Sequence, residues 1–258
     1  MDKKNDVSPN MQKLLELGAE IADLSGIMAL LGWDQQVMMP PGGAEERGMQ
    51  SAVLGRIMHE KFTSDEVGDL IANLEEEVGD LSAETDEARA VKFAKREFEK
   101  RARVPLPLLM ETIVTASRAH EMWVKAKAGS DFSIFQPLLE KTVDLRKQYA
   151  ELFQPYDHIY DALLDDFEPG MKTADVKEIF DALRPRQVEL IKEISQKEAP
   201  DDSFLRQPYK REYQEMFGKE VITRFGYDWN RGRLDVAPHP FTTSFGLGDV
   251  RITTRYLK

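Results

Sequence analysis

The chain has four histidines from which an imidazole-based metal or acid–base site could be built: His59, His120, His158 and His239. The zinc-peptidase motif His-Glu-x-x-His needs two histidines four residues apart, so that both face one cation while the glutamate activates a water molecule. His59 and His120 are each followed by glutamate, but neither has the second histidine. We therefore predict no catalytic residue and no metal ligand here, and interpret His59 as a surface or capping residue and His120 as a hydrogen-bonded core residue.

His239 and Arg251 have the setting that best suits ligand binding. Pro238 and Pro240 favour an extended backbone around His239, and Arg251 projects from a predicted strand. Together the two side chains could donate to an anionic or carbonyl group. The alternative is an ordinary edge hairpin, because Arg and His are common on exposed strands.

Other chemistry has less support in the sequence. Asp157, His158 and Asp161 have a spacing that could place them together as a new metal site, which we keep as a hypothesis. The chain has no cysteine, which excludes disulfides, thiolate metal ligands and cysteine nucleophiles. No glycine-rich nucleotide fingerprint, phosphate loop or Gly-x-Ser-x-Gly elbow is present.

The elements that position these residues are mostly helices. Apolar residues three and four apart predict long helices over residues 11–36, 44–62, 82–103, 108–128 and 173–197, with another at 209–225 before Gly226. A further helix is predicted to reach Phe153, and short ones to follow Thr63 and to lie within 157–168. The fold class we expect is therefore mainly α, an array of amphipathic helices.

Specific residues are expected to end these helices and to fill the core. We predict a capping box at Thr63 and Glu66, a cap at Ser82 and a left-handed stop at Gly129, and we expect Thr173 to cap the helix that follows it. The predicted core positions include Met49, Val53, Leu54, Ile57 and Met58 in one helix, and Val176, Ile179, Phe180, Leu183, Leu190, Ile191 and Ile194 in another.

A β-hairpin is predicted to close the chain. Residues 237–245 and 249–256 alternate apolar and polar side chains around a Gly246-Leu247-Gly248 turn. We therefore expect a single unit over residues 1–258, with helices over 1–230 and the hairpin over 231–258.

Composition limits the class of protein. The formal charge is −11, which disfavours binding to nucleic acid. No apolar run is long enough to cross a bilayer, and residues 1–10 lack the apolar region of a signal peptide. We expect a cytoplasmic protein with no membrane partner.

Three sequence motifs resemble those of the carboxypeptidase Taq family of metal-dependent carboxypeptidases. Residues 31–50 are similar to the family's Trp-Asp…Met-Pro…Gly…Arg…Gln signature. His239-Pro240-Phe241 is similar to its His-Pro-Phe motif, and Asp249-Val-Arg251-Ile-Thr253 to its Asp-x-Arg-x-Thr motif. The resemblance covers essentially the whole chain.

The resemblance implies an amino-terminal portion of such an enzyme, ending before the family's metal-binding His-Glu-x-x-His helix. Complete family members bind Zn²⁺ or a similar metal, remove single residues from peptide carboxyl termini and form homodimers. By resemblance, His239 and Arg251 belong to the groove that binds the peptide substrate. We expect this chain alone to hold no metal cofactor and to be inactive; the alternative is a non-catalytic helical binding or scaffold protein.

Overall fold

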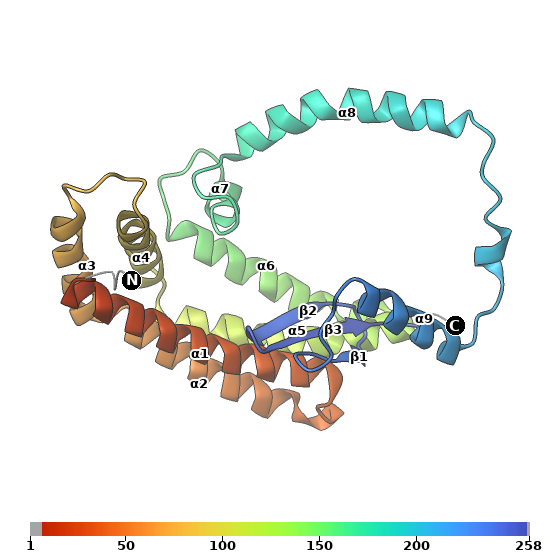
Figure 1. The fold of residues 1–258 in the computed structure, drawn as a ribbon, viewed down its shortest axis with the longest axis horizontal. Helices are drawn as coiled ribbons and strands as arrows, with labels where there is room; N and C mark the ends of the chain where they lie inside the picture. The colour runs from red at the N-terminus through yellow and green to blue at the C-terminus, as the bar shows by residue number, and fades with distance from the viewer. Residues whose placement is uncertain (1–6, 257–258) are drawn as a thin grey trace, which may run out of the picture. The chain divides into compact units, whose positions relative to one another are not determined.

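A computed structural model describes residues 7–256, and these residues are mainly helical (Figure 1). The helices are α1 (Pro9–Val37), α2 (Ala44–Phe62), α3 (Asp65–Val78), α4 (Asp86–Ala102), α5 (Leu106–Gly129), α6 (Gln136–Glu151), α7 (Ile159–Leu164), α8 (Thr173–Ser195) and α9 (Arg211–Arg224). The strands are β1 (Leu234–Val236), β2 (Thr242–Gly246) and β3 (Asp249–Thr254). The predicted fold class is confirmed.

Contacts between backbones divide the chain into two compact units. The first comprises the described residues up to Leu145 together with Asp228–Arg255, and the second comprises Arg146–Tyr227 with Tyr256. From the sequence we predicted a single unit over 1–258. The sheet and α1–α5 thus belong to the first unit, α7–α9 to the second, and α6 runs across the boundary.

The clearest apolar core of the first unit joins α1, α3 and α4. Its buried side chains are Met11, Leu14, Val67, Ile71, Leu74, Val91 and Ala94, with Leu17 and Phe98 packed against them. These positions repeat at helical spacing on each element, so each helix presents one apolar stripe to the others.

The packing of α2 differs from the prediction. Its buried positions include Ala44, Gly48, Ala52, Gly55 and Phe62, most of them small residues. Ile113 of α5 lies where a Cβ on Gly55 would stand, so the missing side chain lets the two helices approach closely. The prediction that the larger residues of α2 form its core is wrong for three of them: Met49, Val53 and Ile57 are exposed.

Several helix ends also differ by a few residues. Ser64, not Thr63, caps α3 by accepting from the backbone N–H of Val67, and Thr85, not Ser82, caps α4. The left-handed residue after α5 is Ser130, at φ 51°, and not Gly129. In each case a second residue with suitable chemistry lies within three positions of the predicted one, and local pattern cannot choose between them.

The carboxy-terminal hairpin is confirmed and has a third strand. β2 and β3 are antiparallel with Thr243 opposite Arg251, while β1 lies parallel to β3 with Leu234 opposite Ile252, giving the order β1-β3-β2. Strand β2 of the sheet contacts α1 at Gly26. A Cβ added to Gly26 would lie 3.0 Å from the carbonyl oxygen of Phe245. Gly26 therefore sets how closely the hairpin approaches α1.

In the second unit, α8 is amphipathic but has no buried side chain. The prediction that its apolar residues form core is wrong: its large apolar residues from Ile179 to Ile194 are exposed. Thr173 is the first residue of α8, and the cap position is Lys172. The expected end of α9 is confirmed, since Gly226 follows it at φ 89°.

Candidate functional site

Two residues of the signature at 31–50 connect α1 to α2. Arg47 donates from Nη2 to Asp34 Oδ2 at 2.7 Å and from Nη1 to the carbonyl oxygen of Leu31 at 2.6 Å. The Arg47 side chain is only 13% exposed. Because charge-assisted bonds shielded from water are stronger than exposed ones, this pair fixes the two helices together across the turn at Pro41–Gly43.

Trp33, the residue before Asp34, supports Arg251. The Arg251 guanidinium carbon lies 4.3 Å from the centroid of the Trp33 ring and 4.7 Å from that of Phe245. The Arg233 guanidinium also lies over Trp33, at 5.2 Å. Two motifs more than 200 residues apart in sequence thus meet through cation–π contacts between α1 and the sheet.

Arg251 is also held by its own strand. It donates from Nε and Nη2 to the two carboxylate oxygens of Asp249, at 2.9 and 2.7 Å. These hydrogen bonds, with the nearby charges of Arg251 and Arg233, hold the pKa of Asp249 below its usual value. The Arg251 side chain is 17% exposed, and the two hydrogen bonds hold its planar guanidinium against Asp249.

Thr253, the last residue of the Asp-x-Arg-x-Thr motif, links that motif to the His-Pro-Phe segment. Its Oγ1 accepts from the backbone N–H of Phe241 at 2.7 Å, and its backbone N–H donates to the Phe241 carbonyl oxygen at 2.9 Å. Thr253 is buried. The Asp-x-Arg-x-Thr strand therefore holds the His-Pro-Phe segment in place at Phe241.

His239 lies against α5. Its ring meets that of Trp123 edge-on, with centroids 6.4 Å apart, and Lys127 lies 4.6 Å over the same Trp123 ring. Lys127 also donates to the carbonyl oxygen of Pro238 at 3.2 Å. His239 itself is exposed. The neighbouring His120 is half-buried, and burial lowers the pKa of its imidazole, which favours the neutral form.

Arg251 and His239, the two residues predicted to bind substrate, thus lie in the same region of the sheet but contact different helices. Arg251 stands opposite Thr243, whereas His239 lies beyond the Phe241–Thr253 link. Arg251 contacts α1 through Trp33, and His239 contacts α5 through Trp123. Their role in binding substrate stays a prediction. The sequence analysis did not predict the contacts of Trp33 and Trp123 with these residues, because apolar periodicity carries no signal for a ring that contacts a distant cation.

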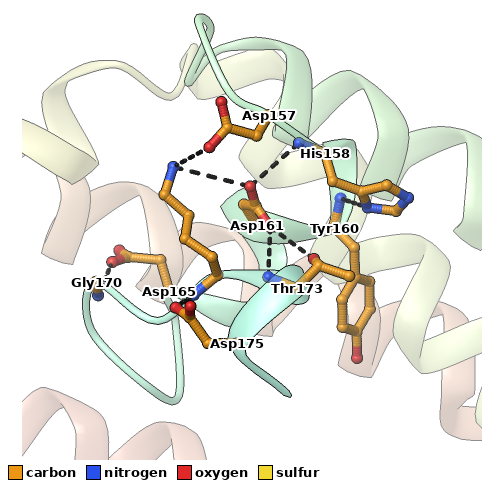
Figure 2. Close-up of polar contacts among 9 residues, drawn as sticks. Asp157, His158, Tyr160, Asp161, Asp165, Gly170, Thr173 and Asp175 are labelled. Carbon is orange, nitrogen blue, oxygen red and sulfur yellow. Dashed lines mark hydrogen bonds and ion pairs between the residues drawn. The ribbon is translucent and has the colours of Figure 1, made fainter. Parts of the chain in front are cut away.

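The hypothesis of a metal site at Asp157, His158 and Asp161 is wrong. Asp161 accepts from the backbone N–H and the hydroxyl of Thr173, at 2.7 and 2.6 Å, and from the backbone N–H of His158 at 3.1 Å (Figure 2). His158 Nδ1 accepts from the N–H of Tyr160. These groups cap α7 and tie it to the start of α8.

The same bonds determine the ionisation of Asp161. The hydrogen bonds from Thr173, then that from His158 and the charge of Lys172, lower the pKa of Asp161, and burial opposes them. Within residues 7–256, no three His, Asp or Glu side chains are grouped so that they could share a metal ion.

No helix among residues 7–256 is both long and apolar enough to cross a membrane.

Comparison with known proteins gives consistent matches. The sequence model of the carboxypeptidase Taq (M32) metallopeptidase family matches residues 13–258. Carboxypeptidase 1 of Bacillus subtilis (strain 168) is 35% identical over 246 residues, covering 95% of this chain and 49% of that protein. Thermostable carboxypeptidase 1 of Thermus thermophilus is 35% identical over 255 residues, covering 95% and 50%.

The fold matches as well. The crystal structure described as BsuCP superposes with a TM-score of 0.90 at 34% identity, covering 96% of this chain and 50% of that one. The chain thus spans about half the length of the curated relatives and solved structures that it resembles.

Proposed function

Because the chain belongs to the carboxypeptidase Taq (M32) metallopeptidase family, we propose that it provides the amino-terminal half of an enzyme that removes single residues from peptide carboxyl termini. The family match over residues 13–258 is the observation that supports this proposal most strongly. The family is one of metallopeptidases, so the complete enzyme carries a divalent metal; that the metal is zinc is part of the proposal.

The metal's chemistry would come from outside this chain. A bound divalent cation polarises a carbonyl group and activates water in peptide hydrolysis. Neither His-Glu pair of the sequence, at His59 and His120, is followed by a second histidine in motif spacing. We therefore propose that the chain by itself is catalytically inactive.

This chain would contribute to the binding of the peptide substrate. We propose that Arg251 and His239 line the groove, with Arg251 pairing with a carboxylate of the peptide. The contacts of Arg251 with Trp33, Phe245 and Asp249 support this role, because they orient the guanidinium before substrate arrives and so reduce the entropy lost on binding. His239 is exposed beside Trp123, which leaves its imidazole accessible.

Two further properties of the complete enzyme are part of the proposal. We propose that it is a homodimer and that it acts in the cytoplasm. The absence of cysteine from the sequence agrees with a reducing compartment.

A second function is supported by one observation, the exposed apolar residues of α8. A non-catalytic binding or scaffold protein would use such a surface for protein contacts. The two functions differ in metal dependence: the first predicts hydrolysis once the rest of the enzyme is supplied, and the second predicts binding without turnover.

The test is the release of free amino acid from an amino-blocked dipeptide by the purified chain, with Zn²⁺ or Co²⁺ added and with a chelator as control. We expect no chelator-sensitive release from a folded, monodisperse sample. Chelator-sensitive turnover would show that metal ligands lie among residues that we have assigned other roles.

A further inference from the structure

The exposed apolar residues of α8 form two groups along one side of the helix, separated by Arg186 and Gln187. We define the α8 apolar face as Ile179, Phe180, Leu183, Leu190, Ile191 and Ile194. Each of these side chains is between 43% and 65% exposed. At 100° per residue all six fall within one sector of the helix, and over 23 residues the helix is about 35 Å long.

The opposite side of α8 has a different character. Lys177 and Asp181 form an ion pair one turn apart there, and Lys192 also lies on this side. The helix is therefore amphipathic, with a polar side suited to water and an apolar side that is not. Single exposed apolar residues are ordinary on protein surfaces, whereas six on one side of one helix, including a phenylalanine, are typical of a surface that another chain segment covers.

The residues of the second unit do not supply that cover. No side chain of α8 is buried, and α9 likewise has no buried side chain among its described residues. By contrast, α1, α3 and α4 bury their apolar stripes against one another. The sequence of α8 thus has the pattern of a core helix without its partner.

The length of the relatives indicates what the partner is. This chain matches nearly its whole length to only 49% of Bacillus subtilis Carboxypeptidase 1 and to 50% of the Thermus thermophilus enzyme. We propose that the α8 apolar face is the docking surface for the other half of an M32 carboxypeptidase, and that this half presents an apolar helical surface to it. The proposal rests on the proposed function, because it takes the chain to be half of such an enzyme.

The absence of cysteine makes the docking surface directly measurable. A single Leu190→Cys substitution places one thiol on the α8 apolar face, and Lys192→Cys, two residues along, places a matched thiol on the polar side. Each variant is expressed alone and together with the polypeptide of Bacillus subtilis Carboxypeptidase 1 that lies outside its match to this chain. The rate of alkylation is then measured on this chain by mass spectrometry, with and without the partner.

We expect the partner to slow alkylation of Leu190→Cys by about tenfold or more and to leave Lys192→Cys within about twofold of its rate alone. A second variant, Leu183→Glu with Leu190→Glu, changes only exposed positions and should abolish co-purification of the two polypeptides. Equal alkylation of both thiols in the complex, or failure of the two polypeptides to associate, would overturn the proposal.

Other occupants give different results. Protection of Leu190→Cys in the chain alone, increasing with its concentration, would identify a second copy of this chain as the occupant and would also overturn the proposal. Turnover by a complex in which α8 stays reactive would overturn the docking proposal and leave the proposed function standing. Protection of α8 without turnover would support docking and count against the enzyme.

Discussion

At the scale of single residues, Arg47 of the family signature has a structural role. Its guanidinium joins Asp34 and the Leu31 carbonyl of α1 to α2 while remaining largely shielded from water. We predict that Arg47→Met lowers the free energy of unfolding by about 1–3 kcal/mol, because it leaves polar groups of α1 without their partner. Arg56→Met is the control, since Arg56 and Glu60 form an exposed pair, and it should change stability by less than about 0.5 kcal/mol. Equal losses in urea unfolding would contradict this account.

Asp161 should make the start of α8 sensitive to acid. Its folded pKa is lowered, so its stabilising contribution is complete above the unfolded value of 3.8 and is lost as pH falls through the folded pKa. We predict that Asp161→Asn lowers the melting temperature at pH 7 and that the difference from wild type shrinks below pH 4. Melting curves across pH 3–7 measure this.

Asp157→Asn provides the matched control for that experiment. Asp157 also pairs with Lys172 but is 86% exposed, so its removal should have little effect at any pH. A difference between Asp161→Asn and wild type that stays constant down to pH 3 would rule out the proposed role of the Asp161 carboxylate.

Some of these residue roles could be predicted and others could not. The strand position of Arg251 could be predicted from alternating side chains, because that pattern is a local signal; the binding role of Arg251 and His239 stays a proposal. The support that Trp33 gives Arg251 depends on a contact across more than 200 residues, and the link from Asp161 to the start of α8 depends on Thr173 being folded back onto it. Neither contact has a signature in local spacing.

At the scale of elements, Gly26 controls how the sheet meets α1. A Cβ added to Gly26 would lie 3.0 Å from the backbone oxygen of Phe245. The ring of Phe245 also lies against the Arg251 guanidinium. Gly18, on the same helix, has no atom within 4 Å of that position. We predict that Gly18→Ala stabilises the chain by about 0.5–1 kcal/mol through helix propensity, and that Gly26→Ala is less stable than Gly18→Ala by about 1–3 kcal/mol. Urea denaturation of the two variants compares them directly; equal stabilisation would show that β2 does not approach α1 at Gly26.

Periodicity predicted where the helices lie, but it did not always predict which side of a helix is buried. In α1 and α4 the buried core residues Met11, Leu14, Val91 and Ala94 repeat at helical spacing. In α2 close packing against α5 selects Gly48, Ala52 and Gly55, so a pattern weighted by hydrophobicity indicates the wrong side. Small residues bury little apolar area and give a weak signal, although they determine how closely the helices approach.

At the scale of the whole molecule, the two compact units should differ in stability. α8 and α9 bury no side chain, whereas α2 and α5 pack closely against each other. We predict that backbone amides of α8 and α9 in the chain alone exchange with deuterium at least about tenfold faster than those of α2 and α5. Hydrogen-exchange mass spectrometry measures this, and equal protection of the four helices would contradict it.

The exposed residues of α8 are the largest departure from what the sequence led us to expect. Their spacing correctly predicts an amphipathic helix, yet amphipathicity does not say which chain provides the cover. The proposed cover from outside this chain is argued from the match to half of each relative, and not from the pattern within α8.

The measurement that tests the central claim most directly is hydrolysis of an amino-blocked dipeptide by the two halves of the enzyme, separately and together. The account predicts chelator-sensitive release of free amino acid when this chain is combined with the remaining half of Bacillus subtilis Carboxypeptidase 1 and Zn²⁺ is added, and none from either half alone. Turnover by this chain alone, or no turnover by a stable complex of the two halves, would contradict it.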